Sequence, residues 1–564
     1  MDWMGATLTR YPELAVFLVV GVGYWIGAFK LRGFGLGPVT GSLLVGLILG
    51  SLVAIPVSST AKSILFLLFL FGIGYSVGPK FFDAMKGGGL RWVLLAVVIA
   101  GSGLVTAYAV TRVLGLDAGY AAGMVSGALT ESPAIGTATE AINALPLPEA
   151  ERNRLIGHVA VADAICYVFG AMGVILFCSV IGPRLLRLDL KAEAIRVEKE
   201  LGIDRARPGV ASAWRAFEWR AYRIAADGRA AGQSVAQLES AVPSARVFVE
   251  RIRRGSLMLE PSADLRLEAG DVVAVAARRD VLTDVIGRAS AEEVEDREVL
   301  DVPIATYDVF VTSTAVAGRT LADIARSDMS LRSVFLHSIR RGGQDIPVAP
   351  GTIIERADIV RLTGPEPAVV RAAGEIGKTV LPSDTTDFVA LGLGIVAGAL
   401  LGAVVVIPLG VLRIPLGTSV GTLLMGLVVG YLHSRRPLFA RIPEGAISFM
   451  NALGLAAFVA MIGLGAGPHF IDALREAGVG LFLGGMVVTT VPLMVGLYFG
   501  RYVLRLDPLL LLGGIAGALT MTAGMAGVQE RSGSPVAVLG YSGTVAVGHI
   551  LLTTWGTVIV HMVS

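Results

Sequence analysis

The sequence predicts a polytopic α-helical membrane protein: two inverted repeats, each with about five spans and a broken or re-entrant hairpin, and a soluble α+β insert between them. Composition is the first reason, because the 564 residues are 54% hydrophobic with a mean hydropathy of +0.71, and several apolar stretches could cross a bilayer. Repetition is the second, since Gly-Pro-Lys-Phe-Phe-Asp-Ala at 78–84 returns as Gly-Pro-His-Phe-Ile-Asp-Ala at 467–473. Charge is the third: well over half of the charged residues lie between Arg184 and Asp384, which indicates a soluble region there.

The repeat extends beyond this phrase, because further matches follow in the same order in both halves. They pair 41–50 with 421–430, Gly127-Ala-Leu-Thr130 with Gly517-Ala-Leu-Thr520, Val159-Ala-Val161 with Val545-Ala-Val547, and Gly170 with Gly556. Such an order indicates duplication of a whole membrane unit. Internal repeats of this kind form the central site of many secondary transporters.

Six apolar segments are expected in each half, and the fifth differs from the others. The segments are 12–29, 36–54, 60–78, 92–113, 119–141 and 157–181, then 387–410, 415–433, 446–467, 478–500, 508–530 and 537–561. Each fifth segment is rich in Gly, Ser, Thr and Ala and is interrupted, at 130–133 in one copy and 520–524 in the other. We therefore expect a broken helix or a re-entrant hairpin there.

The positions of Lys and Arg predict the orientation. If each fifth segment enters and leaves by one face, each half has five crossings and the halves are inverted. An outside N-terminus then places most basic residues inside and makes the insert cytoplasmic, in the inner membrane of a bacterium. The exceptions are Lys62, Arg112, Arg152, Arg154, Arg413 and Arg475. Counting the fifth segments as full spans would instead make the repeats parallel and place the insert outside.

The insert is itself duplicated. Residues 247–255 match 334–342, and Asp271-Val-Val matches Asp358-Ile-Val at the same offset of 87. Short alternating runs and Arg-Arg-Gly turns predict small strands around a short helix, so two α+β modules are expected. The predicted domains are a first membrane repeat (1–190), a helical connector (191–213), two regulatory modules (214–290 and 291–380) and a second membrane repeat (381–564). The acidic stretch 291–298 is expected to be the linker between the modules.

The Gly-Pro pairs predict helix boundaries. Pro favours the first turn of a helix and disfavours helical geometry in the residue before it. Gly78-Pro79 and Gly467-Pro468 should therefore each end one helix and begin another, either as a plain turn at the membrane edge or as a hinge.

The two fifth segments are the predicted substrate site. Half-helices that meet inside the membrane leave unpaired N–H groups and a partial positive charge, both of which attract carboxylates, and nearby hydroxyls can orient a small polar solute. The alternative is that these small residues only pack helices closely. The candidate residues are Gly127, Ala128, Leu129, Thr130, Glu131, Ser132 and Pro133, and Gly517, Ala518, Leu519, Thr520, Met521 and Thr522.

Few ionisable residues lie at membrane depth, and such residues are functional candidates because burying them alone is costly. Aligning Gly170 with Gly556 places Asp163 opposite His549, and both are predicted to bind substrate or a coupling ion. Aligning Gly127 with Gly517 pairs Glu140 with Glu530, for which an exposed helix end is an equal alternative.

Several other functions lack support in the sequence. It has no Walker loop and no His-Glu-x-x-His, and the insert has no dinucleotide fingerprint, so we expect no catalytic residue, metal or cofactor. A net charge of +2 predicts no nucleic-acid partner. The Arg253-Arg254 and Arg340-Arg341 turns could bind an anionic regulator, but solvated strand ends are the favoured explanation.

With its paired membrane halves, its two Gly-Pro phrases, and modules that contain Gly270-Asp-Val-Val and Ala357-Asp-Ile-Val, the chain resembles the aspartate:alanine exchanger family of bacterial transporters. The modules resemble the C-terminal domains of potassium-conductance regulators, without the nucleotide-binding partner domain. The resemblance implies an antiporter of amino acids or dicarboxylates, a homodimer and a bilayer partner, with an unknown ligand for the insert. A sodium- or proton-coupled symporter and a gated channel are the alternatives.

Overall fold

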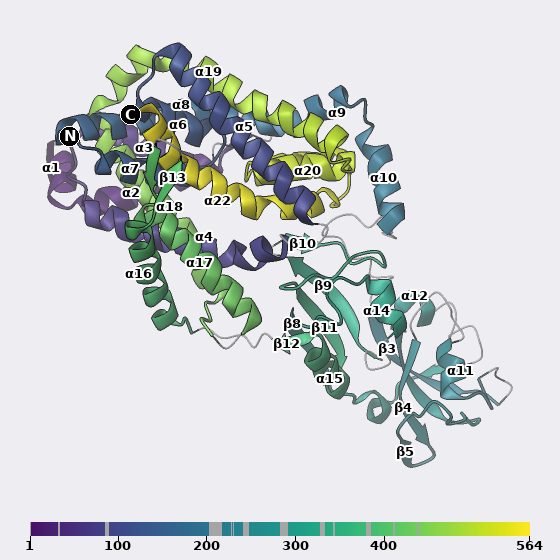
Figure 1. The fold of residues 1–564 in the computed structure, drawn as a ribbon. Coiled ribbons are helices and arrows are strands. Elements are labelled where there is room, and N and C mark those ends of the chain that lie inside the picture. Colours follow the sequence, from purple (N-terminus) through teal and green to yellow (C-terminus); the bar gives the residue numbers. More distant parts are fainter. Residues whose placement is uncertain are drawn as a thin grey trace. The chain divides into compact units, whose positions relative to one another are not determined.

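The computed structural model describes residues 2–31, 34–35, 37–84, 89–201, 217–226, 228, 230–240, 247–282, 291–327, 333–341, 344–379, 385–409, 412–436 and 439–564. The chain divides into two compact units (Figure 1). The membrane unit is formed chiefly by Met1–Val197 and Pro382–Ser564, and the insert by Glu198–Arg341 and Asp345–Leu381.

The main helices and hairpins of the two membrane halves follow the same order, and the first half has in addition α1 (Asp2–Arg10) before them and two further helices after them. The first contains α2 (Pro12–Ala28), the hairpin β1 (Lys30–Leu31) and β2 (Phe34–Gly35), α3 (Pro38–Leu52), α4 (Ser59–Ala84), α5 (Leu90–Leu114), α6 (Ala118–Ala128), α7 (Pro133–Ala144) and α8 (Glu149–Leu176). A π-helical turn (Phe177–Ile181), α9 (Gly182–Leu185) and α10 (Leu190–Leu201) follow.

The second half contains α16 (Phe388–Val404), the hairpin β13 (Val406–Leu409) and β14 (Leu412–Pro415), α17 (Thr418–Arg435), α18 (Glu444–Ala466), α19 (Phe470–Tyr498), α20 (Pro508–Ala518), α21 (Thr522–Ser532) and α22 (Ala537–Val563). A 3-10 turn (Gly467–His469) precedes α19 and a π-helical turn (Phe499–Val503) follows it. The fifth segment of each half is thus a broken helix, as predicted.

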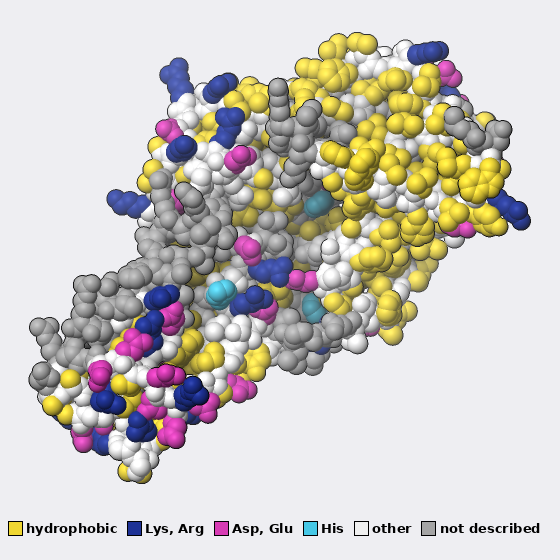
Figure 2. All heavy atoms as spheres, turned by 180° about the vertical axis from the view of Figure 1, so that it is seen from behind, with side chains coloured by type: hydrophobic (Ala, Val, Ile, Leu, Met, Phe, Trp, Pro, Cys, Tyr) yellow, Lys and Arg dark blue, Asp and Glu magenta, His cyan; other side chains and the backbone are white. Residues whose placement is uncertain are grey.

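Six described helices are long and apolar enough to cross a membrane: α4, α5, α8, α18, α19 and α22. The sharply bent pair of α1 and α2 would be a seventh span if it is counted as one. The other predicted spans are shorter, since α2, α3, α16 and α17 have between 15 and 18 residues. Figure 2 shows apolar side chains spread over the visible surface of the membrane unit, as a bilayer requires.

Glycines let the helices of the membrane unit pack in two groups. In bundle A (α2–α4 and α16–α18), a Cβ at Gly74 would lie 2.3 Å from the Leu423 carbonyl oxygen, and one at Gly46 would lie 2.8 Å from that of Ala460. In bundle B (α5–α8 and α19–α22), a Cβ at Gly123 would lie 2.2 Å from the Val159 carbonyl oxygen. Such approaches require a residue without a side chain.

The insert contains two modules with one strand order. The first sheet is ordered β5-β4-β6-β3-β7 and the second β10-β9-β11-β8-β12. The first module contains β3 (Phe217–Ile224), α11 (Val235–Ser240), β4 (Val247–Arg254), β5 (Leu257–Leu259), β6 (Val272–Arg278), α12 (Arg279–Val281) and β7 (Ala291–Val294). After α13 (Arg297–Leu300), the second contains β8 (Ile304–Val311), α14 (Leu321–Ser327), β9 (Phe335–Arg341), β10 (Gln344–Ile346), β11 (Ile359–Pro365), α15 (Glu366–Ile376) and β12 (Gly377–Thr379).

Two expectations about these elements were wrong. The acidic stretch 291–298 is not only a linker, because its first four residues form β7 and pair antiparallel with β3 of the first module. Two contacts accompany this pairing: Val294 packs on the buried side of the sheet, and Arg223 and Arg220 pair across the strands with Glu292 and Glu293. The module boundary predicted at 290/291 therefore falls before the last strand of the first sheet.

The Gly-Pro phrases also differ from each other. Pro79 lies inside α4, which continues to Ala84, so the helix end predicted at Gly78-Pro79 is wrong. Gly467-Pro468 does separate two helices, through a single 3-10 turn. Both glycines pack closely: a Cβ at Gly78 would lie 2.3 Å from the Leu427 carbonyl oxygen, and one at Gly467 would lie 2.3 Å from the carbonyl carbon of Gly50. The hinge role of Gly78, Pro79, Gly467 and Pro468 stays a prediction.

Candidate functional site

The breaks of the two fifth segments meet. The first break lies between α6 and α7, the second between α20 and α21. Thr130 Oγ1 donates a hydrogen bond of 2.6 Å to the Leu519 carbonyl oxygen, and Thr520 Oγ1 donates one of 2.9 Å to Glu131 Oε2. Residues almost 390 positions apart in the chain therefore form one buried polar crossing.

The backbone at both breaks is strained in the same way. Thr130 has φ 59° and Thr520 has φ 55°, a left-handed conformation that is unfavourable for a β-branched residue. Strain of this kind costs about 1–3 kcal/mol per residue and is concentrated at functional sites. In the first break, Pro133 then begins α7, because its fixed φ suits a first helical position.

Glu131 is the centre of the crossing. Its side chain is 1% exposed, and its carboxylate accepts hydrogen bonds of 2.9 Å from Thr520 and from Thr553, with His549 Nδ1 at 3.2 Å. All three partners belong to the second half. Two hydroxyl donors and an imidazole from the other half make a buried carboxylate tolerable and at the same time hold the two breaks together.

Asp163 lies beside the first break and is 1% exposed. It accepts a hydrogen bond from Ser126 in the last turns of α6. In the second half, the corresponding neighbour of the break is Tyr541, whose hydroxyl shares a 3.0 Å hydrogen bond with Thr522.

The predicted pairing of Asp163 with His549 is wrong. A Cβ at Gly127 would lie 2.5 Å from the Asp163 carbonyl oxygen, and one at Gly517 would lie 2.5 Å from that of Tyr541, so Tyr541 occupies the position that matches Asp163. The structure matches Gly170 with Gly548 rather than Gly556. Small residues recur about every turn in these helices, so the sequence match was displaced by about two turns.

The other predicted site residues lie at or near the two breaks. Ala128 accepts a 2.8 Å hydrogen bond from Thr489 through its carbonyl oxygen, Leu129 is buried, and Ser132 precedes Pro133. Ala518 ends α20, and Met521 precedes Thr522 at the start of α21. Sequence reasoning missed Thr489 and Thr553, although Thr553 follows His549 by four residues and so shares its helix face.

Glu140, near the end of α7, has a different role from the residues at the breaks. Its carboxylate accepts hydrogen bonds from the Thr418 N–H (2.6 Å), the Thr418 hydroxyl (2.5 Å) and the Ser419 N–H (3.0 Å). It therefore caps the N-terminus of α17 and links bundle B to bundle A. Glu530, its partner in the sequence alignment, is exposed.

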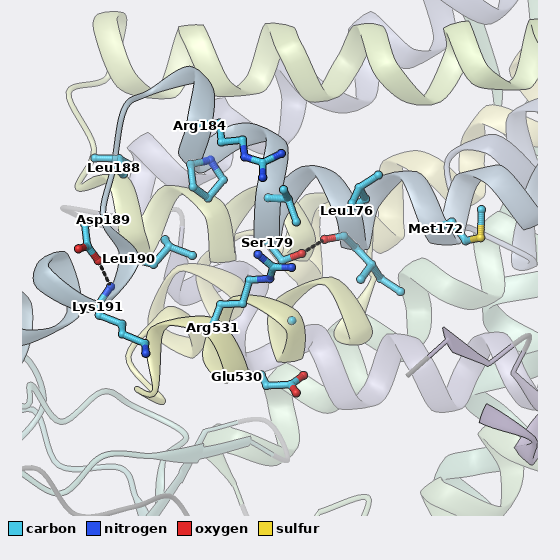
Figure 3. A pocket seen from close by; sticks show the side chains of 14 residues that line it. Met172, Leu176, Ser179, Arg184, Leu188, Asp189, Leu190, Lys191, Glu530 and Arg531 are labelled. Carbon is cyan, nitrogen blue, oxygen red and sulfur yellow. Dashed lines mark hydrogen bonds between the residues drawn. The ribbon is translucent and has the colours of Figure 1, made fainter. Parts of the chain in front are cut away.

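A cavity of about 1070 Å³ lies between the end of α8 and α21, as Figure 3 shows. Arg184, Lys191 and Arg531 line it together with Asp189 and Glu530. The cavity coincides with an asymmetry between the breaks, because nine of the twelve residues of α7 are buried but only four of the eleven in α21. In this structure α7 is thus largely enclosed, whereas α21 borders an open space through Gly527, Glu530 and Arg531.

The arginine turns of the insert bind carboxylates of the insert itself. Arg254 forms a two-pronged ion pair with Asp271, and Arg341 an equivalent one with Asp358, at 2.7 to 2.9 Å. These two guanidinium groups thus fix each module's strands together. The ligand predicted for the insert stays a prediction. Within the described residues no group of three His, Cys, Asp or Glu could hold a metal ion.

Family models match both parts of the chain. A model described as a predicted permease membrane region matches residues 15–183 and 390–561, and a model of the TrkA-C domain matches residues 220–287. The TrkA-C match covers the first module of the insert, and the second module repeats its strand order.

Curated relatives match nearly the whole chain. An uncharacterised transporter of Bradyrhizobium diazoefficiens is 53% identical over 518 residues, which are 92% of this chain and 100% of the relative. One of Bordetella bronchiseptica is 40% identical over 563 residues (98% and 96%), and one of Shewanella oneidensis is 37% identical over 565 residues (99% of each).

Proposed function

We infer the function from one premise: the chain belongs to the aspartate:alanine exchanger family, whose model is described as a predicted permease membrane region. It is a multi-pass membrane transporter with a TrkA-C insert. We propose that it exchanges small carboxylate-bearing solutes, most specifically amino acids of the aspartate:alanine type. The observation that carries the proposal is the buried crossing at which Thr130, Glu131 and Thr520 join the two breaks.

The chemistry of the crossing supports an amino acid. The ends of broken helices offer N–H groups and partial positive charge to a carboxylate. Glu131 and Asp163 are buried carboxyl groups nearby. When ionised, such groups attract an ammonium group and repel a second carboxylate. A zwitterion satisfies both. The cavity beside α21 carries side chains of both signs, which is consistent with its use as an entrance.

The proposed movement is elevator-like. Bundle B carries both breaks and would move against bundle A. At α7, Glu140 binds bundle B to the N-terminus of α17. At its counterpart α21, bundle B borders an open cavity. We further propose that the N-terminus is outside, that the insert is cytoplasmic in an inner membrane, and that the protein is a homodimer.

One observation favours a second candidate, a proton-coupled symporter. His549 and Glu131 lie 3.2 Å apart and could exchange a proton during the cycle. An exchanger would show counterflow of labelled aspartate that needs substrate on the opposite side and no ion gradient. A symporter would accumulate aspartate under an imposed pH or sodium gradient with no substrate inside.

The test uses purified protein in liposomes loaded with alanine, with labelled aspartate outside. Thr130→Ala and Thr520→Ala should each lower the exchange rate at least about tenfold, since they remove a buried and a partly buried hydrogen bond at the crossing. Thr130→Ser and Thr520→Ser keep the hydroxyl and should retain most of the rate. Equal rates in the Ala and Ser variants, with normal folding, would exclude this site. Wild-type protein that exchanges no amino acid or dicarboxylate would exclude the proposed function.

A further inference from the structure

The first turns of α3 and α17 are counterparts that differ in one respect. Gly37 and Gly417 precede them with almost the same conformation, φ 80°, ψ 154° and φ 80°, ψ 150°. A Cβ at Gly417 would lie 3.2 Å from Glu140 Oε2, so a carboxylate fills the space beside that glycine. At Gly37 the nearest heavy atom would be the Tyr167 hydroxyl at 4.0 Å. The same helix start thus has a close carboxylate in one half and the more distant Tyr167 hydroxyl in the other.

The first turn of α3 carries hydrogen-bond donors of the same kinds as the first turn of α17, but at different positions. At α17 the carboxylate receives two N–H groups and the Thr418 hydroxyl. At α3 the first residue is Pro38, which has no N–H, but Val39 and Thr40 follow with theirs and Thr40 adds a hydroxyl. The α3 start therefore offers two N–H groups and one hydroxyl, the same kinds of donor that Glu140 receives at the α17 start.

Thr40 gives independent evidence for a missing acceptor. Its side chain is 2% exposed, and its Oγ1 is buried without a hydrogen-bond partner. Tyr167 interacts with Thr40, but the two hydroxyls do not meet hydrogen-bond geometry. A buried hydroxyl normally has a partner, so one left unpaired beside free N–H groups indicates a group that binds there in another state.

We propose that the N-terminus of α3, with Thr40, is a carboxylate-binding site of the transport cycle. The model for its ligand is Glu140 at α17, where the chain shows which group such a helix start accepts. The site rests on the proposed transport function. Two carboxylates could reach it, that of the transported solute and that of Glu530, which corresponds to Glu140 in the sequence repeat and lines the open cavity.

The first arm of the test measures equilibrium binding of labelled aspartate to the purified full-length protein. Thr40→Val introduces valine, the residue type that α17 has at the corresponding position, Val420. The substitution replaces the hydroxyl with a methyl group and keeps the shape of the side chain. Ser42→Ala is the matched control, because Ser42 is also buried in α3 but already donates to the Pro38 carbonyl oxygen. If the solute carboxylate is the ligand, Thr40→Val weakens binding at least about tenfold and Ser42→Ala does not.

The second arm tests Glu530 without any substrate. Val39→Cys with Glu530→Cys should form an intramolecular disulfide under mild oxidation if Glu530 reaches the α3 start, and each single-cysteine variant is its control because Cys166 and Cys178 are buried. The proposal is overturned if the Thr40→Val variant binds aspartate as tightly as the wild type and the double-cysteine variant forms no disulfide. If wild-type protein binds no aspartate, the proposed substrate fails. The disulfide alone then decides, and its formation supports the carboxylate site while its absence overturns it.

Discussion

Two threonines show how single residues define the crossing. Thr130 and Thr520 occupy the same position in the two halves, both have positive φ, and each donates its hydroxyl to the opposite break. Glycine would adopt this backbone without strain, but it has no hydroxyl. The retained threonines therefore fit a site where side-chain chemistry outweighs the local cost in stability.

Ala357, in the insert, is another non-glycine residue with positive φ, and it allows a test of this strain. It has φ 69°, and its counterpart in the first module is Gly270, with φ 91°. We expect Ala357→Gly to stabilise the second module by about 1 kcal/mol, because the left-handed conformation is costly for an L-residue with a Cβ. Hydrogen exchange of peptides from β8 and β11 in the full-length protein should slow.

The reverse change provides the control for this prediction. Gly270→Ala places a Cβ in the same conformation in the first module and should speed exchange in β3 and β6. Slower exchange in β3 and β6, or faster exchange in β8 and β11 of Ala357→Gly, would contradict the account of strain.

At the scale of elements, α7 and α21 are counterparts in different surroundings. α7 is largely enclosed, and its Glu140 caps α17 through three hydrogen bonds. α21 borders the cavity with its Glu530 exposed. The second half-helix of the break is thus hydrogen-bonded to bundle A in the first half of the chain (α7) and borders a cavity in the second half (α21).

This difference predicts unequal effects of the same substitution. Glu140→Ala should destabilise the protein by about 1–2 kcal/mol, because it removes a cap that satisfies two backbone N–H groups at a helix N-terminus. Glu530→Ala should leave stability nearly unchanged. The measurement is the apparent unfolding temperature of each full-length variant in detergent, compared with the wild type. A larger decrease for Glu530→Ala would show that α21 is fastened as firmly as α7.

At the scale of the whole membrane unit, the division into two bundles decides what can move. Bundle B meets bundle A where Gly136 of α7 lies on the ring of Phe66 of α4, which in turn stacks on Phe458 of α18 with ring centroids 4.4 Å apart. A Cβ at Gly136 would lie 2.1 Å from Phe66 Cζ. A glycine against a flat ring leaves no protruding group at this contact.

A side chain at Gly136 should therefore impair the movement. We expect Gly136→Val to lower aspartate counterflow at least about tenfold, which corresponds to a barrier increase of about 1.4 kcal/mol. Phe66→Ala in the same chain should restore most of the rate by making room. Gly101→Val is the control, because a Cβ at Gly101 meets no atom within 4 Å. Failure of Phe66→Ala to rescue exchange would remove this contact from the proposed pathway of movement.

Much of the architecture could be predicted because it depends on local and repeated patterns. Apolar length placed the helices, small polar residues placed the two breaks, and the offset of 87 found the duplicated modules. The failures involved contacts between distant segments. Ala291–Val294 pairs as a strand with β3, and Pro79 lies inside a helix that packs closely on α17.

The sequence by itself determined the class of protein, the duplication and the residues of the two breaks, because hydropathy and repeats are properties of the chain's order. Only the tertiary structure decided that Glu131 is bonded to Thr520 and Thr553, that Tyr541 rather than His549 matches Asp163, and that Glu140 caps α17. The physical reason is that a buried carboxylate must find donors wherever the fold brings them, and these donors lie hundreds of residues away.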